Sequence, residues 1–220
     1  MENEIQALRS KLMNSYIKSD FNLSQFIIYI KLIREWNLRI NLISKNDEKR
    51  IVERHVLESI AVLDGVEIPP RSLCLDLGSG GGFPGMPIKI VRSDLEISFL
   101  DSKRMKCLFL KKVCDELGLN GANVICQRVE AFAQENSKKF DFIFARGVAV
   151  LSQLWQWGQT LLSQGGKLLA WKGGELIGEI DALLGAYPDV KTKILKLPSQ
   201  FVDPALDRKV VIITRDQTNK

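Results

Sequence analysis

A glycine-rich segment is the part of this sequence most clearly suited to chemistry. Residues 73–77 form an apolar run, and Gly78-Ser79-Gly80-Gly81-Gly82 follows it directly. Glycines permit positive φ in a turn, and they let backbone N–H groups approach a ligand with no Cβ in the way. Pro84 then suits the first turn of a helix. The segment therefore predicts a strand, a loop that binds a nucleotide-like cofactor, and a helix.

Two acidic residues flank this loop. Asp76 lies two residues before Gly78, which gives the pattern D-x-G-x-G-x-G, and Asp101 ends the next apolar run. A carboxylate there accepts hydrogen bonds from ribose hydroxyls, a device that NAD enzymes also use. Gly80-x-Gly82-x-x-Gly85 alone also matches the dinucleotide fingerprint. Structural roles stay open for each acid taken alone: Asp76 would cap the loop, and Asp101 would cap the following helix.

Composition and charge set limits on the class of protein. The chain has 220 residues, 45% of them hydrophobic and 26% charged, which is typical of one soluble globular domain. The net charge of +5 permits an anionic partner without requiring one. The acidic start of the chain lacks a secretory signal, and no apolar run is long enough to span a bilayer. We therefore expect a cytoplasmic protein with no membrane partner.

The spacing of apolar residues predicts where helices and strands must position these groups. We expect helices at 23–36, 48–63, 84–91, 103–118, 130–136 and 150–163. We expect strands at 72–77, 97–100, 124–126, 140–145, 167–171, 192–197 and 209–214. Asn22 and Gln25 are spaced like a capping box before the first of these helices. The pattern divides the chain into an N-terminal helical extension, 1–65, and an α/β domain, 66–220, that together form one compact unit.

The remaining side chains narrow the chemistry. Cys74, Cys107, Cys114 and Cys126 lack zinc-site spacing, so we interpret them as buried small hydrophobes and predict no metal. The sequence Phe144-Ala145-Arg146-Gly147 lacks the Asn/Asp-Pro-Pro-aromatic motif of exocyclic-amine methyltransferases, and no cysteine adjoins a proline as cytosine C5 chemistry requires. His55, the single histidine, is interpreted as a packed residue. We predict no catalytic acid or base, and a reaction driven by positioning.

The motifs together resemble the ribosomal RNA small subunit methyltransferase G family. The resemblance covers about residues 20–215, and the phrase Gly81-Gly82-Phe83-Pro84-Gly85 with Pro87 is far more specific than the glycines alone. Further matching segments are Trp36-Asn37, Asn41-Leu42-Ile43-Ser44, Arg54-His55-Val56-Leu57-Glu58-Ser59, Leu100-Asp101-Ser102 with Lys106, Arg128-Val129-Glu130, Ala145-Arg146 and Lys172-Gly173.

This resemblance implies a fold, a donor and an acceptor. It implies a class I S-adenosylmethionine-dependent methyltransferase: a Rossmann-like, mostly parallel seven-stranded sheet whose last strand is antiparallel. It implies methyl transfer to guanine N7 of 16S rRNA, whose free lone pair needs no general base. The cofactor-binding residues would be Asp76, Gly78, Gly80, Phe83, Asp101, Val129, Glu130 and Arg146, although Arg146 could instead face the RNA or pair with a neighbouring acid. The chain departs from the family at Glu58, where Asp is usual, and at Gly81.

Basic residues bear on the RNA partner. Lys103, Arg104, Lys106, Lys111 and Lys112 fall in one expected helix. Taken alone, such a run indicates a solvated face, but with an rRNA substrate phosphate contact becomes the better interpretation. Trp155 and Trp157 favour core packing over base stacking. We expect a monomer that acts on 16S rRNA or a small-subunit particle. An NAD-dependent oxidoreductase and a non-catalytic RNA-binding protein with a vestigial cofactor loop remain the alternatives.

Overall fold

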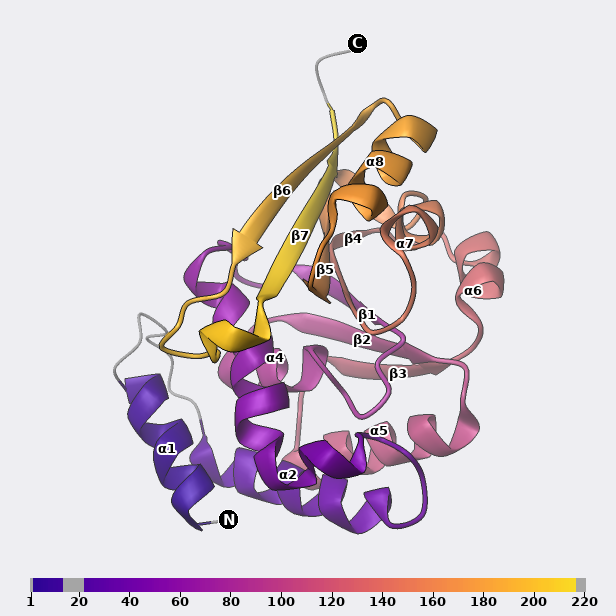
Figure 1. Ribbon diagram of the computed structural model, residues 1–220. Helices are drawn as coiled ribbons and strands as arrows, with labels where there is room; N and C mark the ends of the chain where they lie inside the picture. The colour runs from indigo at the N-terminus through magenta and orange to yellow at the C-terminus, as the bar shows by residue number, and fades with distance from the viewer. Residues whose placement is uncertain (1, 14–21, 217–220) are drawn as a thin grey trace.

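Seven strands form one mixed sheet in the computed structural model, which describes residues 2–13 and 22–216. The strands are β1 Leu73–Leu77, β2 Glu96–Asp101, β3 Ala122–Cys126, β4 Phe140–Arg146, β5 Leu162–Gly173, β6 Val190–Lys196 and β7 Arg208–Arg215. Their order across the sheet is β3-β2-β1-β4-β5-β7-β6. Only β7 runs antiparallel to its two neighbours (Figure 1). The predicted architecture is confirmed.

The sheet reverses its direction of growth beside β1. The chain adds β2 and then β3 on one side of β1, and returns to place β4 on the other side. Residues 74–77 of β1 and 142–145 of β4 are buried, as expected of strands covered on both faces. In such a sheet, ligands bind at the carboxyl ends of the strands where the order reverses. This point lies at the end of β1, where the glycine loop begins.

Helices cover both faces of the sheet (Figure 1). On one face pack α1 Glu2–Met13, α2 Leu23–Asn37, α4 Gly85–Val91 and α5 Arg104–Leu117. On the other pack α6 Val129–Glu135, α7 Leu151–Gly158 and α8 Ile177–Ala186. Between α2 and β1 the chain is helical but irregular: η1 Lys45–Arg50 and η3 Ala61–Asp64 are 3-10 turns, η2 Val52–Leu57 is a π-helix, and α3 is Glu58–Ile60. A last 3-10 turn, η4 Pro204–Leu206, precedes β7.

The helical extension shares its core with the sheet domain. One continuous cluster of buried residues includes Leu8 of α1, Phe26 of α2, Phe109 of α5 and Val210 of β7. Gln25 of α2 donates a hydrogen bond of 2.7 Å to the carbonyl oxygen of Leu117 in α5. The capping box was therefore only half right: Asn22 caps the helix through the N–H of Ser24, whereas Gln25 is used for this tertiary contact.

One expected helix had the wrong bounds, and one helix was not expected. The helix predicted over 150–163 ends at Gly158, because β5 already begins at Leu162 and pairs there with Phe140. The β4–β5 register then shifts between Phe140 and Phe142, and the additional β5 residues at this shift include the glycine pair at 165–166. Helix α8 was not predicted, since it contains two glycines and buries only Leu183. Apolar residues at helical spacing continue past Gly158 to Leu161 and Leu162, so strand pairing ends α7 against the local pattern, whereas α8 lies where local apolar periodicity is weak.

The cysteine prediction was right for Cys74 and Cys107, which are buried free thiols, and wrong for Cys126, which is exposed. Cys126 ends β3, an edge strand, so one of its sides has no neighbouring strand to cover it. Trp155 is fully buried and Trp157 packs against the same cluster, as expected. Within residues 2–13 and 22–216, no helix has the length and apolar character needed to cross a membrane.

Candidate active site

The predicted cofactor residues lie at the carboxyl ends of β1, β2, β3 and β4. Asp76 is the second-to-last residue of β1 and the glycine loop follows Leu77, while Asp101 is the last residue of β2. Cys126 pairs with Asp101 in the sheet, so the chain leaves β3 beside Asp101 and begins α6 at Val129. Arg146 is the last residue of β4. The topology therefore brings the predicted set to one edge of the sheet.

Backbone hydrogen bonds hold the glycine loop against the end of β2. The N–H groups of Gly78 and Ser79 donate to the carbonyl oxygen of Leu100 at 2.8 and 3.0 Å. The N–H of Gly80 donates to Asp101 Oδ2 at 2.9 Å. Gly78, Gly80 and Gly82 have φ of 71, 57 and 93°. These positive values explain why the loop needs glycine at alternate positions.

Close approach adds a second requirement for glycine. A Cβ at Gly85 would lie 2.7 Å from Asp76 Oδ2, and a Cβ at Gly78 would lie 2.7 Å from Val148 Cγ2. Val148 belongs to the segment that follows β4, and Lys172 Nζ donates to the carbonyl oxygen of Ala149 in that segment. The segment after β4 therefore covers the start of the glycine loop and is itself held by β5.

Asp76 is a fully buried acid inside this turn. Its Oδ2 accepts a hydrogen bond of 3.1 Å from the N–H of Gly85, while no hydrogen-bond partner of Oδ1 is recorded among the described residues. Burial raises the pKa of Asp76 to about 7. Asp76 therefore caps the loop through Oδ2, the structural role that the sequence left open, while its Oδ1 is buried without a hydrogen-bond donor among the described residues.

Asp101 does not cap α5 itself, whose N-cap residue is Lys103, but its side chain holds the turn that leads into the helix. Its Oδ1 accepts from the N–H of Lys103 at 2.8 Å, immediately before α5 begins, and its Oδ2 holds Gly80. Each oxygen has further lone pairs, so these bonds leave room for ribose hydroxyls. Glu130 is exposed and Val129 partly buried in the first turn of α6.

Arg146 points toward the helical extension. Its Nη2 donates to the carbonyl oxygen of Arg54 at 2.7 Å, and lies 3.0 Å from His55 Nδ1 and 3.2 Å from Glu58 Oε2. Its guanidinium also lies 6.0 Å from the centre of the Phe83 ring. Arg146 thus joins the end of β4 to residues 54–58 while touching one predicted cofactor residue.

His55 is packed, as expected from the sequence. Its ring centre lies 4.8 Å from that of Phe83. Burial, reinforced by the charge of Arg146, lowers the pKa of His55 to about 3. The imidazole is therefore neutral at neutral pH, with Nδ1 accepting from Arg146 and the proton on Nε2, which lies 3.5 Å from Asp47 Oδ2.

Sequence analysis assigned no role to two residues that support the site, although Glu58 was noted there as a departure from the family. Tyr29 of α2 donates a hydrogen bond of 2.6 Å to the carbonyl oxygen of Gly81. Glu58 is 2% exposed and lies between two arginines, 3.2 Å from Arg146 and 3.3 Å from Arg208. An acid in the apolar pattern of 51–60 was the available signal for Glu58, because a buried carboxylate needs a cationic partner. No local signal marks Tyr29.

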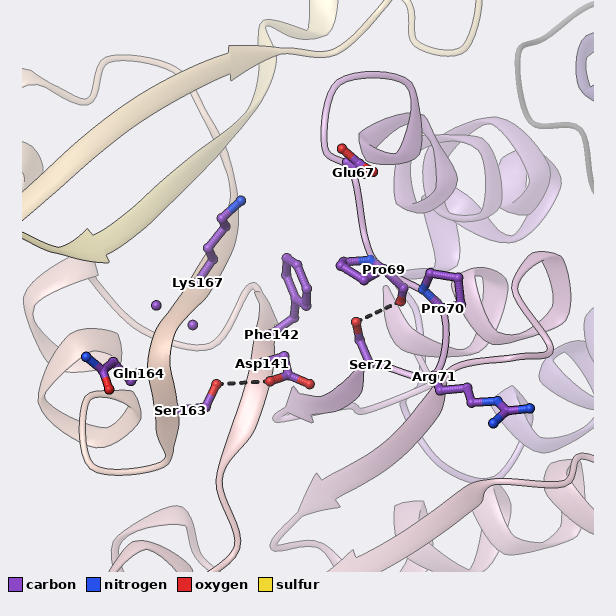
Figure 2. A pocket seen from close by; sticks show the side chains of 12 residues that line it. Glu67, Pro69, Pro70, Arg71, Ser72, Asp141, Phe142, Ser163, Gln164 and Lys167 are labelled. Carbon is purple, nitrogen blue, oxygen red and sulfur yellow. Dashed lines mark hydrogen bonds between the residues drawn. The ribbon is translucent and has the colours of Figure 1, made fainter. Parts of the chain in front are cut away.

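A separate hollow lies at the opposite edge of the sheet. This cavity has a volume of about 560 Å³ and lies between the start of β1 and the bulged start of β5. Figure 2 shows the side chains that line it. Three of its polar side chains are used within the protein: Asp141 accepts from Ser163 and from the N–H of Leu73, and Ser72 donates to the carbonyl oxygen of Pro69. None of the predicted cofactor residues lines this cavity, so the candidate active site remains at the glycine loop.

Comparisons with known proteins agree with this geometry. Residues 22–199 match the sequence profile of the family described as rRNA small subunit methyltransferase G. The chain belongs to this family. It is 36% identical over 205 residues to the Ribosomal RNA small subunit methyltransferase G of Clostridium botulinum strain 657, which covers 90% of this chain and 86% of that protein. It is 33% identical over 213 residues to the protein of the same name from Caldicellulosiruptor bescii, with 94% and 89% covered.

Solved structures share the fold of this methyltransferase G family member. A predicted O-methyltransferase from Agrobacterium tumefaciens superposes with a TM-score of 0.58, at 15% identity, over 74% of this chain and 82% of that one. Ribosomal protein L11 methylase from Lactobacillus delbrueckii gives a TM-score of 0.56, at 16% identity, over 73% and 77%. These likenesses support the class I methyltransferase architecture that the strand order already indicates.

Proposed function

We propose that this protein transfers a methyl group from S-adenosylmethionine to N7 of a guanine in 16S rRNA of the small ribosomal subunit. Membership of the methyltransferase G family carries the proposal. The glycine loop and its acids agree with it. The protein is an S-adenosylmethionine-dependent enzyme, and nothing in the geometry favours the oxidoreductase or the vestigial RNA-binding alternative.

The residues present fit this cofactor. Gly80 is the loop glycine with open space beside it, because a Cβ there would meet no atom closer than Lys106 Nζ at 3.8 Å, so its backbone is accessible to a ligand. Asp76 Oδ1 is a buried acceptor without a donor among the described residues. In the proposed site, Gly78, Gly80 and Phe83 form the cradle, Asp101 serves the ribose, Val129 and Glu130 serve the adenine, and Arg146 closes the crevice.

The proposed reaction requires the protein to position the methyl donor and the guanine and to stabilise the positive charge of the donor. S-adenosylmethionine supplies an electrophilic methyl group on a positively charged sulfonium. Guanine N7 has a free lone pair, so no side chain needs to remove a proton before attack. Neutral His55 is turned toward Arg146 and Asp47, which agrees with a reaction that uses no general base. The carboxylates of Asp101 and Glu130, with Asp76 adding charge as it ionises near pH 7, give this edge of the sheet a negative character that suits a cationic donor.

A basic face lies next to this edge. Lys103, Arg104 and Lys111 are exposed on α5 or directly before it, whereas Lys112 pairs with Glu116 at 2.6 Å. Lys106 Nζ lies 3.8 Å from where a Cβ at Gly80 would stand. Lysines and arginines so placed would contact RNA phosphates while a guanine enters the crevice. We further propose that the enzyme acts as a cytoplasmic monomer on 16S rRNA or on the small-subunit particle.

The test is transfer of labelled methyl groups to small-subunit RNA that lacks the modification. Purified enzyme should label 16S rRNA in naked or assembled form, and mass spectrometry should place the label on N7 of one guanine. Calorimetry should detect binding of S-adenosylmethionine and none of NAD. Absence of labelling on every RNA form would refute the proposed substrate, and binding of NAD in place of S-adenosylmethionine would refute the donor.

A further inference from the structure

Tyr29 connects the helical extension to the glycine loop. It lies on α2, is fully buried, and donates its hydroxyl hydrogen to the carbonyl oxygen of Gly81 at 2.6 Å. Burial raises the pKa of Tyr29 well above its ordinary value of 10. The hydroxyl therefore remains a protonated donor throughout the pH range in which an enzyme is assayed.

The bond fixes one end of a peptide group whose other end is also held. The carbonyl of Gly81 and the N–H of Gly82 belong to the same planar peptide, and that N–H donates to the carbonyl oxygen of Ser79 at 2.7 Å. A Cβ at Gly82 would lie 2.9 Å from the Tyr29 hydroxyl oxygen. The tyrosine is thus packed against a loop position that accepts only glycine, and rotation of this peptide would break both bonds.

The ring of Tyr29 extends the contact to the end of the loop. Its centre lies 5.6 Å from that of Phe83, and the two rings are tilted by 49°. Phe83 contacts the extension a second time through His55. Tyr29 and His55, from two separate segments of the extension, therefore both pack against Phe83. Tyr29 also donates the hydrogen bond to the carbonyl oxygen of Gly81.

We propose that Tyr29 is a positioning residue for the cofactor loop, acting through the carbonyl oxygen of Gly81. The inference rests on the proposed function, because that function places S-adenosylmethionine on this loop. Tyr29 touches no reacting atom. Its effect is to hold the peptide between Gly81 and Gly82 in one orientation, so the loop enters binding already ordered and less conformational freedom is lost.

The test is the variant Tyr29→Phe, which keeps the ring and removes only the hydroxyl. Tyr187→Phe is the matched control, because Tyr187 packs against the hydrophobic cluster on the other face of the sheet and is far along the sequence from the loop. Calorimetry should show about fivefold weaker binding of S-adenosylmethionine for Tyr29→Phe, the change that corresponds to one ordinary hydrogen bond. Methyl transfer at saturating cofactor should retain the wild-type kcat, so the defect appears in KM.

Hydrogen exchange supplies a readout that does not depend on activity. Amides of residues 79–82 should exchange faster in Tyr29→Phe, while those of α2 and the sheet keep wild-type rates, and Tyr187→Phe should change neither. Unchanged cofactor affinity together with unchanged loop exchange would overturn the proposal, as would faster exchange spread over α2 and α5, which marks a general loss of packing. If wild-type protein binds no S-adenosylmethionine, the proposed function fails, and the exchange comparison still decides whether Tyr29 holds the loop.

Discussion

Asp76 shows how a single residue ties the chemistry of the loop to the stability of the fold. It is fully buried, and burial raises its pKa from an ordinary value of 3.8 to about 7. Between these pH values the folded protein holds a proton that the unfolded chain has released. The stability contributed by this group is therefore complete below pH 3.8 and is lost as pH rises through 7.

The unliganded protein should accordingly become less stable as pH rises from about 5 to about 8. Asp76 alone should lower the free energy of unfolding by about 2–3 kcal/mol over that interval. Asp76→Asn should remove this part of the pH dependence, whereas Asp181→Asn, at an exposed position on α8, should preserve it. Urea unfolding at several pH values measures the difference. Equal slopes for wild type and Asp76→Asn would contradict the role assigned to burial.

Glu58 is the second residue whose removal has a defined consequence. Its carboxylate is nearly inaccessible and faces both Arg146 and Arg208. Glu58→Gln leaves two guanidinium groups facing one another without the anion, so we expect a loss of about 3 kcal/mol or more in the free energy of unfolding. Glu53→Gln is the control: Glu53 pairs with Arg50 at the surface, and its loss should cost about 1 kcal/mol at most. Similar losses for both variants would count against the buried network.

Helix α5 has a buried side and a basic side, and the two have different roles. Cys107, Phe109, Leu110 and Val113 pack against the sheet, while Lys103 and Arg104 at its start are exposed beside the glycine loop. Because α5 begins immediately after Asp101, the end of β2 sets where these charges stand. The element therefore presents the proposed RNA contacts at a fixed position relative to the cofactor.

The double variant Lys103→Glu, Arg104→Glu should weaken RNA binding and leave S-adenosylmethionine binding unchanged. Removing two phosphate contacts should reduce the slope of log affinity against log salt by about 1.4–1.8. The control is the double variant Lys193→Glu, Lys196→Glu, which changes the net charge by the same amount at exposed positions on β6, the strand at the far edge of the sheet. This control should bind RNA more tightly than the α5 variant. Filter binding at several salt concentrations measures the RNA affinity of each variant. Equal losses of RNA affinity in the two variants would argue against a local contact at the start of α5.

At the scale of the whole molecule, the extension and the sheet domain depend on each other. The division at residue 65 stays a prediction, but the largest buried cluster crosses it, joining α1 and α2 to α4, α5 and β7. Removing residues 1–65 would expose the apolar faces of α4 and α5 and delete the partners of Arg146. A shared core of this kind makes cooperative unfolding the expected behaviour.

Full-length protein should therefore unfold in one urea transition, with coincident midpoints by far-UV circular dichroism and by tryptophan fluorescence. The truncated chain 66–220 should lack a cooperative transition. Single-tryptophan variants keeping either Trp36 in the extension or Trp155 in α7 report the two regions separately. Two resolved midpoints, or a truncated chain that unfolds cooperatively, would show that the regions are independent domains.

The sequence by itself determined the loop and its neighbours. Residues such as Gly78, Gly82 and Pro84 act through their own backbone conformations, and the apolar runs before Asp76 and Asp101 mark strands whose ends must share an edge. These effects are local, so pattern and spacing were sufficient. The methyl donor and acceptor followed from resemblance to the family, which the comparisons confirm.

Tertiary structure alone decided which side chains complete the site. Tyr29 reaches Gly81 across 52 residues, and Glu58 lies beside Arg146 across 88, so neither contact leaves a periodic signal in the chain. Arg146 could be placed at a strand end from the sequence, but its direction toward residues 54–58 could not. Helix α8 and the early start of β5 were decided in the same way, because packing and strand pairing outweigh weak local preference.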